Sequence, residues 1–286
     1  MNICTGSTSV MKPRVTTDSD PFAFLRHDSA VREAVYLLER ITETGSLHKA
    51  ATSLGLDEDL AWDCVVAANN LSDIPLLSLS ADGLTPTLQG RQFLDPEENL
   101  TSAFQCFLDT SAGGAFDQFH LRHQFLRRLV ARTSARNQIF CHVRSVRRER
   151  VNAVVNLDIG GGDLLSAHIT AQSVVRLGLL GGSTCHALID PGWVEVQPGT
   201  QTGQNGQHNC LNGKVVRCLD DPVDAEVAIE LNGGRIIIAS MTRAEMAEKA
   251  ILVGQPAYAV IQTSQIILAV EAPPESSSEN HRGDKS

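Results

Sequence analysis

Two short segments of this chain concentrate side chains that donate hydrogen bonds. The first, "RTSARNQIF" at residues 132–140, contains two arginines, two hydroxyl side chains and an asparagine. The second, "HITAQSVVRLGL" at residues 168–179, adds two more hydroxyl side chains and an arginine. Hydrogen bonds to a charged acceptor are strong, and the planar guanidinium of arginine can bind two oxygens of one anion. The two segments together therefore predict a site for a small tetrahedral oxyanion.

The candidate ligands form two groups. Ser134 and Arg136, with nearby backbone N–H groups, supply one side of the predicted site. Thr170 and Ser173 supply the other side, together with the N–H groups of a turn that opens at Ala171. The stretch "TAQS" is typical of the start of a helix, where exposed N–H groups form a natural anion site. An alternative remains open, in which these hydroxyl and amide groups only cap strands and turns.

Other patterns in the chain do not indicate catalysis. The glycine-rich stretch "DIGGGD" at residues 158–163 lacks the Gly-Lys-Ser ending of a phosphate-binding loop, so it predicts a hairpin turn. We find no Ser-His-Asp or paired-carboxylate arrangement, and no histidines and cysteines with the full spacing of a zinc site. We therefore expect a binding protein without catalytic residues or a bound metal ion, and not an enzyme.

The two segments lie where the hydrophobic pattern has a period of two, which is typical of strands. This pattern extends from residue 133 to residue 270, and residues 156–196 are echoed by residues 230–270 at an offset of 74. Two units of about 65 residues, each long enough for five strands, predict two small barrels in tandem. We place them at residues 132–197 and 208–271, joined by a linker rich in glycine and glutamine.

The residues before the strands follow a helical period. Residues 28–95 predict three helices joined by tight turns and then a hairpin, which is the arrangement of a winged helix-turn-helix domain. Residues 96–131 predict a helical linker that contributes to dimerisation. Residues 1–27 read as a loose leader, and residues 272–286 have the composition of a disordered tail. The predicted fold class is thus α+β with several domains.

Charge is distributed unevenly along the 286 residues, whose formal net charge is −9. Residues 28–98 contain 13 acidic and four basic side chains, whereas residues 120–150 contain nine arginines and one acid, which indicates separate modules. The arginines either pack against the acidic N-terminal domain, as we favour, or form a surface that attracts DNA or anions. The seven cysteines have no paired spacing, and neither a signal peptide nor a membrane span is evident, so we expect a cytoplasmic protein.

The two hydroxyl-rich segments also resemble a known signature. "TSARNQ" at residues 133–138 and "ITAQSVVRLGL" at residues 169–179 are similar to the motifs of the molybdate-binding Mop domain. Together with a winged helix whose third helix contains "AW" followed by "N", they resemble the ModE-type molybdate-responsive transcriptional regulators over roughly residues 30–270. The resemblance implies two OB-like barrels and a homodimer that binds molybdate or tungstate between its paired Mop regions. It also implies attachment to a palindromic double-stranded DNA operator.

The resemblance also identifies ligand positions and one departure from them. Four residues match the family's ligand positions: Ser134, Arg136, Thr170 and Ser173. Asp190, however, stands where the partner subunit normally contributes a lysine. Two unit charges about 4 Å apart interact by roughly 1 kcal/mol in water and about 4 kcal/mol at an intermediate dielectric. The change therefore weakens binding, unless Asp190 points away or another cation such as Arg176 replaces the lysine. The second repeat lacks the first motif, which is expected if only some interfaces bind the anion.

The expected DNA-binding surface is less typical of its class. The residues placed to contact DNA are Ser46, His48, Lys49, Asn69, Asn70 and Arg91. However, the presumed recognition helix opens with acidic residues 57–59 and also contains Asp63, and acidic side chains repel DNA phosphates. Two functions therefore remain open. Our leading hypothesis is a dimeric molybdate-dependent transcriptional regulator, and the alternative is a molybdate-binding storage or buffering protein whose winged helix no longer reads DNA.

Overall fold

The computed structural model describes residues 29–80, 83–93, 133–201 and 206–271, together with Arg128. The expected leader at residues 1–27 and the expected tail at residues 272–286 lie outside the described residues. The expected linker at residues 96–131 also lies outside them, apart from Arg128. Among the described residues, no helix is both long enough and apolar enough to cross a membrane.

The N-terminal part forms helices followed by a two-stranded hairpin, as the sequence predicts for a winged helix-turn-helix domain. Its elements are α2 (Ser29–Thr44), α3 (Leu47–Leu54), α4 (Glu58–Leu71), β1 (Leu77–Ser80), β2 (Gly83–Pro86) and α5 (Leu88–Phe93). Ser46 caps α3 by accepting a hydrogen bond from the backbone N–H of Lys49, and Gly55 ends that helix in the left-handed conformation. Asp57 then caps α4, so a short turn joins the two helices.

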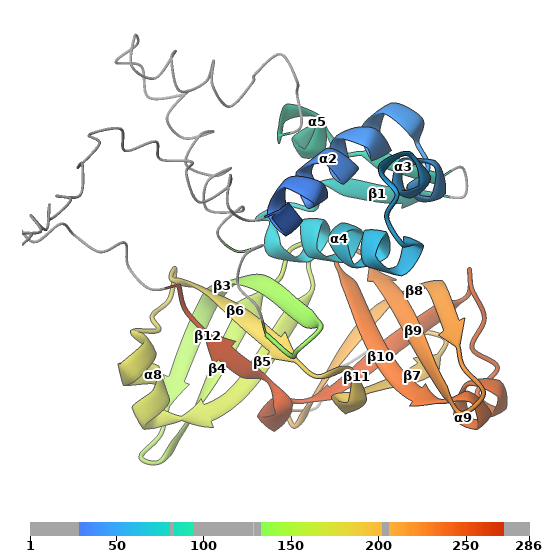
Figure 1. Cartoon of the computed structure of the whole chain (residues 1–286). Coiled ribbons are helices and arrows are strands. Elements are labelled where there is room, and N and C mark those ends of the chain that lie inside the picture. Colours follow the sequence, from blue (N-terminus) through green and yellow to red (C-terminus); the bar gives the residue numbers. More distant parts are fainter. Residues whose placement is uncertain (1–28, 81–82, 94–127, 129–132, 202–205, 272–286) are drawn as a thin grey trace, which may run out of the picture.

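Two five-stranded antiparallel sheets follow, each curled into a half-barrel (Figure 1). The first repeat contributes β3 (Asn137–Arg148), β4 (Asn152–Asp158), β5 (Leu164–Thr170), α8 (Ala171–Leu177), β6 (Thr184–Ile189), η1 (Pro191–Trp193) and β7 (Val194–Pro198). The second contributes β8 (His208–Asp220), β9 (Asp224–Leu231), β10 (Ile236–Thr242), α9 (Arg243–Glu248), β11 (Pro256–Gln262), η2 (Thr263–Gln265) and β12 (Ile267–Ala269). Apolar residues of both repeats share one hydrophobic core.

Each sheet takes its last strand from the other repeat. The first sheet has the order β12-β6-β3-β4-β5, and the second has the order β10-β9-β8-β11-β7. Strand β12, at the end of the second repeat, pairs with β6, and β7, at the end of the first repeat, pairs with β11. The expected tandem barrels are therefore present, but they are interlocked rather than joined only by a linker.

Reciprocal contacts show that the two repeats correspond at an offset of 72 residues and not 74. The side-chain amide of Asn137 exchanges two hydrogen bonds with the backbone of Ile238, and that of Asn209 exchanges two with the backbone of Ser166. Asn137 and Asn209 are 72 residues apart in the chain, and so are Ser166 and Ile238. A shift of two residues leaves every side chain on the same face of its strand, so alternation alone does not detect it.

The winged-helix domain rests on the two sheets through α4, which lies between α2 and the strands (Figure 1). The buried face of α4 shares a hydrophobic cluster with Ile236 and Ile238 of β10. Arg235, which is 2% exposed, holds the C-terminal end of α4. Its guanidinium donates hydrogen bonds to the carbonyl oxygens of Ile159, Asn69, Asn70, Ser72 and Asp73. Burial lowers the pKa of Arg235 to about 10, so the side chain still carries its charge at neutral pH.

Candidate functional site

The first group of candidate ligands lies at the start of β3. Ser134 and Arg136 precede Asn137, the first residue of that strand, and Asn137 pairs with Ile189 at the end of β6. Asp190 follows Ile189 directly, so it lies at the same end of the sheet. We call Ser134, Arg136 and Asp190 the arginine half-site.

A cavity of about 230 Å³ adjoins the arginine half-site. One side of this cavity is formed by α4, from Asp63 to Leu71, and the other by side chains of the segment before and at the start of β3, namely Thr133, Ala135, Arg136 and Gln138. The helix that the sequence predicts to read DNA therefore borders the segment that it predicts to bind the anion.

Arg136 lies between two carboxylates in this structure. Its Nη1 pairs with Glu226 of β9, and its Nη2 pairs with Asp63 of α4. Burial raises the pKa of the Glu226 carboxyl group, and the neighbouring Arg136 acts in the opposite direction. The side chain of Arg136 remains 39% exposed, so its guanidinium is still accessible to a small solute.

The second group of candidate ligands lies where β5 ends and α8 begins. Thr170 is the N-cap of α8, and its Oγ1 accepts a hydrogen bond of 3.0 Å from the backbone N–H of Ser173. The hydroxyl oxygens of Thr170 and Ser173 are 2.8 Å apart, and both can rotate to donate to an external acceptor. The N–H of Ala171 already donates to the carbonyl oxygen of Val151. We call Thr170, Ala171 and Ser173 the hydroxyl half-site.

The two half-sites lie at opposite ends of β3. Arg136 directly precedes the first residue of this strand, whereas Thr170 pairs with Asn152, just beyond the turn that follows Arg148. The 12 residues of β3, at about 3.3 Å each, span roughly 35 Å. One copy of the chain therefore does not bring the two segments onto one small anion. A site that contains both of them needs a second copy.

Asp190 acts as a helix cap in this structure. Its Oδ1 accepts a hydrogen bond of 2.8 Å from the backbone N–H of Gly192, at the start of η1. Arg176 lies in the last turn of α8, next to the hydroxyl half-site and not next to Asp190. Within one chain, Arg176 therefore does not replace the lysine that the arginine half-site lacks.

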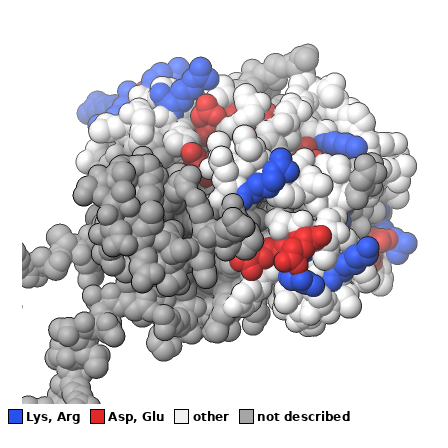
Figure 2. Space-filling model, turned by 90° about the horizontal axis from the view of Figure 1, so that it is seen from above, with Lys and Arg blue, Asp and Glu red and all other residues white. Residues whose placement is uncertain are grey.

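Four of the expected DNA-contacting residues lie at α3 and α5 of the N-terminal domain. These are Ser46, which caps α3, the exposed His48 and Lys49 on α3, and the exposed Arg91 on α5. The Nδ1 of His48 lies 3.0 Å from a carboxylate oxygen of Glu58, so an acidic side chain lies beside this candidate DNA contact. On the face seen in Figure 2, basic side chains lie among acidic and uncharged ones, and the described residues there form no continuous basic surface.

Asn69 and Asn70 do not face solvent, contrary to the prediction that they contact DNA. They are 0% and 1% exposed, respectively. The Asn69 amide bonds to the backbone of Leu77 and to the carbonyl oxygen of Gly234. The Asn70 amide exchanges two hydrogen bonds with the backbone of Ile236. Both asparagines thus join α4 to the second repeat, because their amides satisfy backbone groups that this packing buries.

The acidic residues of α4 also face the barrels. Asp63 pairs with Arg136, and Asp59, one turn earlier, pairs with Arg217 of β8. The Arg217 guanidinium lies 5.4 Å from the ring centroid of Trp62, which adds a cation–π contact. The presumed recognition helix is therefore engaged with the C-terminal region along its length. The sequence shows these acidic residues, but it does not show that Arg136 and Arg217 pair with them.

Arg128 joins the end of α4 to both repeats. It donates a hydrogen bond to the carbonyl oxygen of Leu71, forms an ion pair of 2.6 Å with Glu271, and lies 3.6 Å from the ring centroid of Phe140. This arrangement favours the interpretation that the basic stretch packs against the N-terminal domain. Three other arginines in that prediction lie outside the described residues: Arg122, Arg127 and Arg132.

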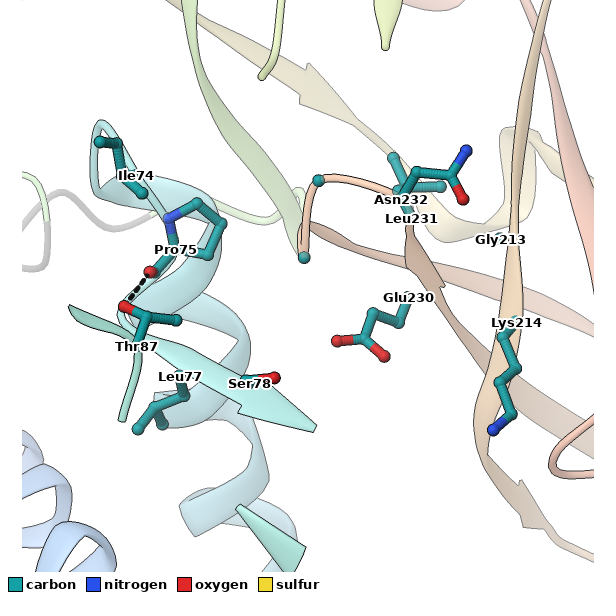
Figure 3. Close-up of a pocket in the computed structure, with 12 residues that line it drawn as sticks. Ile74, Pro75, Leu77, Ser78, Thr87, Gly213, Lys214, Glu230, Leu231 and Asn232 are labelled. Carbon is teal, nitrogen blue, oxygen red and sulfur yellow. Dashed lines mark hydrogen bonds between the residues drawn. The ribbon is translucent and has the colours of Figure 1, made fainter. Parts of the chain in front are cut away.

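A larger cavity, of about 480 Å³, lies between β1 and the second sheet (Figure 3). Lys214 of β8 and Glu230 of β9 line it and stand opposite each other as an ordinary cross-strand charge pair. Neither half-site lines this cavity, so it is not the predicted oxyanion site.

Comparison with known proteins identifies the strand-rich part of the chain. Residues 133–196 and 207–268 each match the TOBE domain. The chain is 34% identical over 246 residues to molybdenum-pterin-binding protein MopB of Rhodobacter capsulatus, an alignment that covers 83% of this chain and 89% of that protein. It is 28% identical over 271 residues to molybdenum transport protein ModE of Azotobacter vinelandii, covering 90% of this chain and 96% of that protein.

A solved structure of the cytoplasmic molybdate-binding protein ModG with bound molybdate aligns with 49% of this chain and 100% of its own, at 33% identity and a TM-score of 0.47. The two matched domains behind a winged helix define a tandem TOBE-domain protein with an N-terminal helix-turn-helix module. Its sequence identity to these relatives, over most of their length, then identifies the family to which it belongs. The chain belongs to the family of the ModE regulators and Mop proteins, which confirms the resemblance seen in its motifs.

Proposed function

We propose that this chain is a molybdate-dependent transcriptional regulator that acts as a homodimer. The observation that carries the proposal is the division of the ligand set into two half-sites at opposite ends of β3, in a chain whose relatives are named for molybdenum. A dianion such as molybdate or tungstate would be bound where the arginine half-site of one copy meets the hydroxyl half-site of the other. The protein has no catalytic role in this proposal.

The chemistry of the two half-sites suits a tetrahedral dianion. Arg136 supplies a positive charge and paired N–H donors, and Ser134 adds a hydroxyl group beside it. The hydroxyl groups of Thr170 and Ser173 lie 2.8 Å apart and can direct their protons to two oxygens of the same anion. An anion bound in this way would fix the orientation of one copy relative to the other.

DNA binding in this proposal uses the exposed part of the winged-helix domain. The contacts would come from Ser46, His48, Lys49 and Arg91. Coupling requires that the anion binds more tightly to the arrangement of copies that fits DNA than to other arrangements. Regulation by molybdate is then a shift in the population of that arrangement.

A second function is favoured by the position of α4. The helix that would normally enter the major groove is packed against the barrels, with its acids paired to Arg136 and Arg217. A molybdate-binding storage or buffering protein would need no exposed recognition helix. In that case the winged helix would serve packing and dimerisation alone.

Two measurements on the full chain separate these functions. Calorimetric titration with molybdate tests the site, and a gel-shift titration against a pool of palindromic duplexes at about 50 mM salt tests DNA binding, since phosphate contacts are strongest at low salt. The regulator predicts a shift that depends on molybdate and is absent in Arg136→Ala. Molybdate binding without any molybdate-dependent shift would support the storage function instead.

A further inference from the structure

Arg136 has two roles that exclude each other. In the structure its guanidinium holds Asp63 of α4 and Glu226 of β9. In the proposed function the same guanidinium binds the oxyanion. The N–H groups used in the ion pairs are those a dianion would need for bidentate binding, because both Nη atoms carry a carboxylate partner.

We propose that Asp63 and Glu226 compete with the oxyanion for Arg136, so that anion binding and the docking of the N-terminal half of α4 oppose each other. This inference rests on the proposed function, because it concerns the same site. The two carboxylates set the affinity for the anion, and Asp63 links that affinity to the position of α4. If docking of α4 weakens anion binding by a given free energy, anion binding weakens the docking of α4 by the same free energy, because thermodynamic coupling is reciprocal.

The two halves of α4 are held by different kinds of contact. The C-terminal half is fixed by the buried amides of Asn69 and Asn70 and by the buried guanidinium of Arg235. The N-terminal half is held by the partly exposed ion pairs of Asp59 and Asp63, together with the buried side chains of Trp62 and Val66. Exposed ion pairs contribute little to stability, whereas buried hydrogen bonds are costly to break. Capture of Arg136 by an anion therefore loosens the N-terminal half of α4 and leaves the C-terminal half in place.

The competition also makes the affinity for the dianion depend on the position of α4. When the anion approaches Arg136, it meets the repulsion of Asp63 and Glu226 as well as the attraction of the guanidinium. Because Asp63 belongs to α4 and Glu226 to β9, movement of α4 removes the first repulsion and not the second. The state with α4 released at its N-terminal half therefore binds the anion more tightly.

Calorimetric titration of the full chain with sodium molybdate tests this inference through Asp63→Asn. The substitution keeps the shape of the side chain and removes its charge, so we expect the Kd to fall by roughly threefold to tenfold. Asp59→Asn is the matched control. It removes the same charge from the same helix, one turn away, but from the pair with Arg217, so we expect its Kd to stay within about twofold of the wild type.

Three outcomes would overturn the inference. If Asp63→Asn binds molybdate with the affinity of the wild type, or if Asp59→Asn gains as much affinity, Asp63 does not compete specifically for Arg136. If neither the wild type nor Asp63→Asn binds molybdate, the proposed function fails and this inference fails with it. Binding by Asp63→Asn where the wild type shows none supports both proposals.

Hydrogen exchange on the wild type provides an independent measurement. Saturating molybdate should speed the exchange of backbone amides near residues 61–66 and leave those near residues 68–72 unchanged, because only the N-terminal half of α4 is released. Sodium chloride at equal ionic strength is the control for screening of the ion pairs. Equal rates with and without molybdate, in a chain shown to bind it, would contradict the competition alone.

Discussion

At the scale of single residues, the charge at position 190 influences how strongly the proposed site holds a dianion. Asp190 lies at the same end of the first sheet as Arg136, and its carboxylate caps η1 through Gly192. Asparagine caps helices about as well as aspartate, so Asp190→Asn removes the negative charge and keeps the cap. We expect the affinity for molybdate to rise by about fivefold to tenfold, as measured by calorimetry.

The control for this substitution is Asp190→Ala, which removes both the charge and the cap. We expect the same gain in affinity together with a lower midpoint of thermal unfolding. If Asp190→Asn leaves the affinity unchanged, the carboxylate lies too far from the bound anion to act on it.

A second residue, Glu271, is expected to make the stability depend on pH in the acidic range. Hydrogen bonding to His186 and to Arg128 lowers the pKa of its carboxyl group from 4.5 to about 2. Because the pKa is lower in the folded chain, the stabilisation is complete above the unfolded value and is lost as the pH falls towards 2. The side chain is 37% exposed, so screening by solvent limits its contribution to about 1 kcal/mol.

Glu271→Gln should therefore lower the free energy of unfolding by about 1 kcal/mol at pH 6. Less than half of that difference should remain at pH 3, where the stabilisation of the wild-type carboxylate is partly lost. Urea unfolding of both proteins at the two pH values measures the change. A difference that stays constant with pH would show that the substitution acts through packing and not through ionisation.

At the scale of the elements, the turns that end β4 and β9 meet closely where the two repeats face each other. Gly161 has φ +65°, and a Cβ added there would lie 2.1 Å from the Cα of Gly233. Gly160 has φ +86°, but a Cβ added there meets nothing within 4 Å. Gly161→Ala therefore adds a clash to the conformational strain, whereas Gly160→Ala adds the strain alone.

We expect Gly161→Ala to lower the free energy of unfolding by about 2 kcal/mol more than Gly160→Ala, since backbone atoms must move to admit the methyl group. Urea unfolding monitored by circular dichroism gives both values. Equal losses in the two variants would show that the repeats can separate at this point without cost.

The sequence predicts where the helices and strands lie better than it predicts which elements pair or pack with one another. The period of two locates the strands, and Ser46 and Gly55 mark the ends of α3 through local capping. Exchange of the last strands is invisible to such patterns, because β7 and β12 have the same alternation whichever sheet they complete. The same applies to α4. Its pairing with Arg136 and Arg217 joins residues far apart in the chain, so packing of the domains decides it.

In the candidate site, too, local sequence predicts some features and only the fold reveals the others. The motifs identify Ser134, Arg136, Thr170 and Ser173 as donors from local sequence alone. Their distribution over two ends of one strand follows from the register of β3, β4 and β5, which the sequence does not display. Glu226, which pairs with Arg136, carries no motif and emerges only from the fold.

At the scale of the whole molecule, the separation of the half-sites determines how many copies make one site. Strand β3 is the central strand of the first sheet and is hydrogen-bonded to β6 and β4, so its two ends cannot approach each other within one chain. In a symmetric dimer, each of two equivalent sites would combine the arginine half-site of one copy with the hydroxyl half-site of the other. Each chain would then contribute to both sites, and defects in different half-sites would complement each other.

Mixed dimers of Arg136→Ala and Ser173→Ala test this arrangement. Neither variant should bind molybdate alone, because each site in its homodimer contains one defective half-site. In the mixed dimer, the Ser173→Ala chain supplies an intact Arg136 to the intact Ser173 of its partner, while the other site has both defects. Dimers carrying two different affinity tags and purified through both should bind about half as much molybdate as the wild type.

A mixture of wild-type and doubly substituted chains is the control, because its mixed dimers have one defect in every shared site and should bind none. No recovery of binding in the first mixture would contradict a site shared between copies, since a site within one chain gains nothing from a partner.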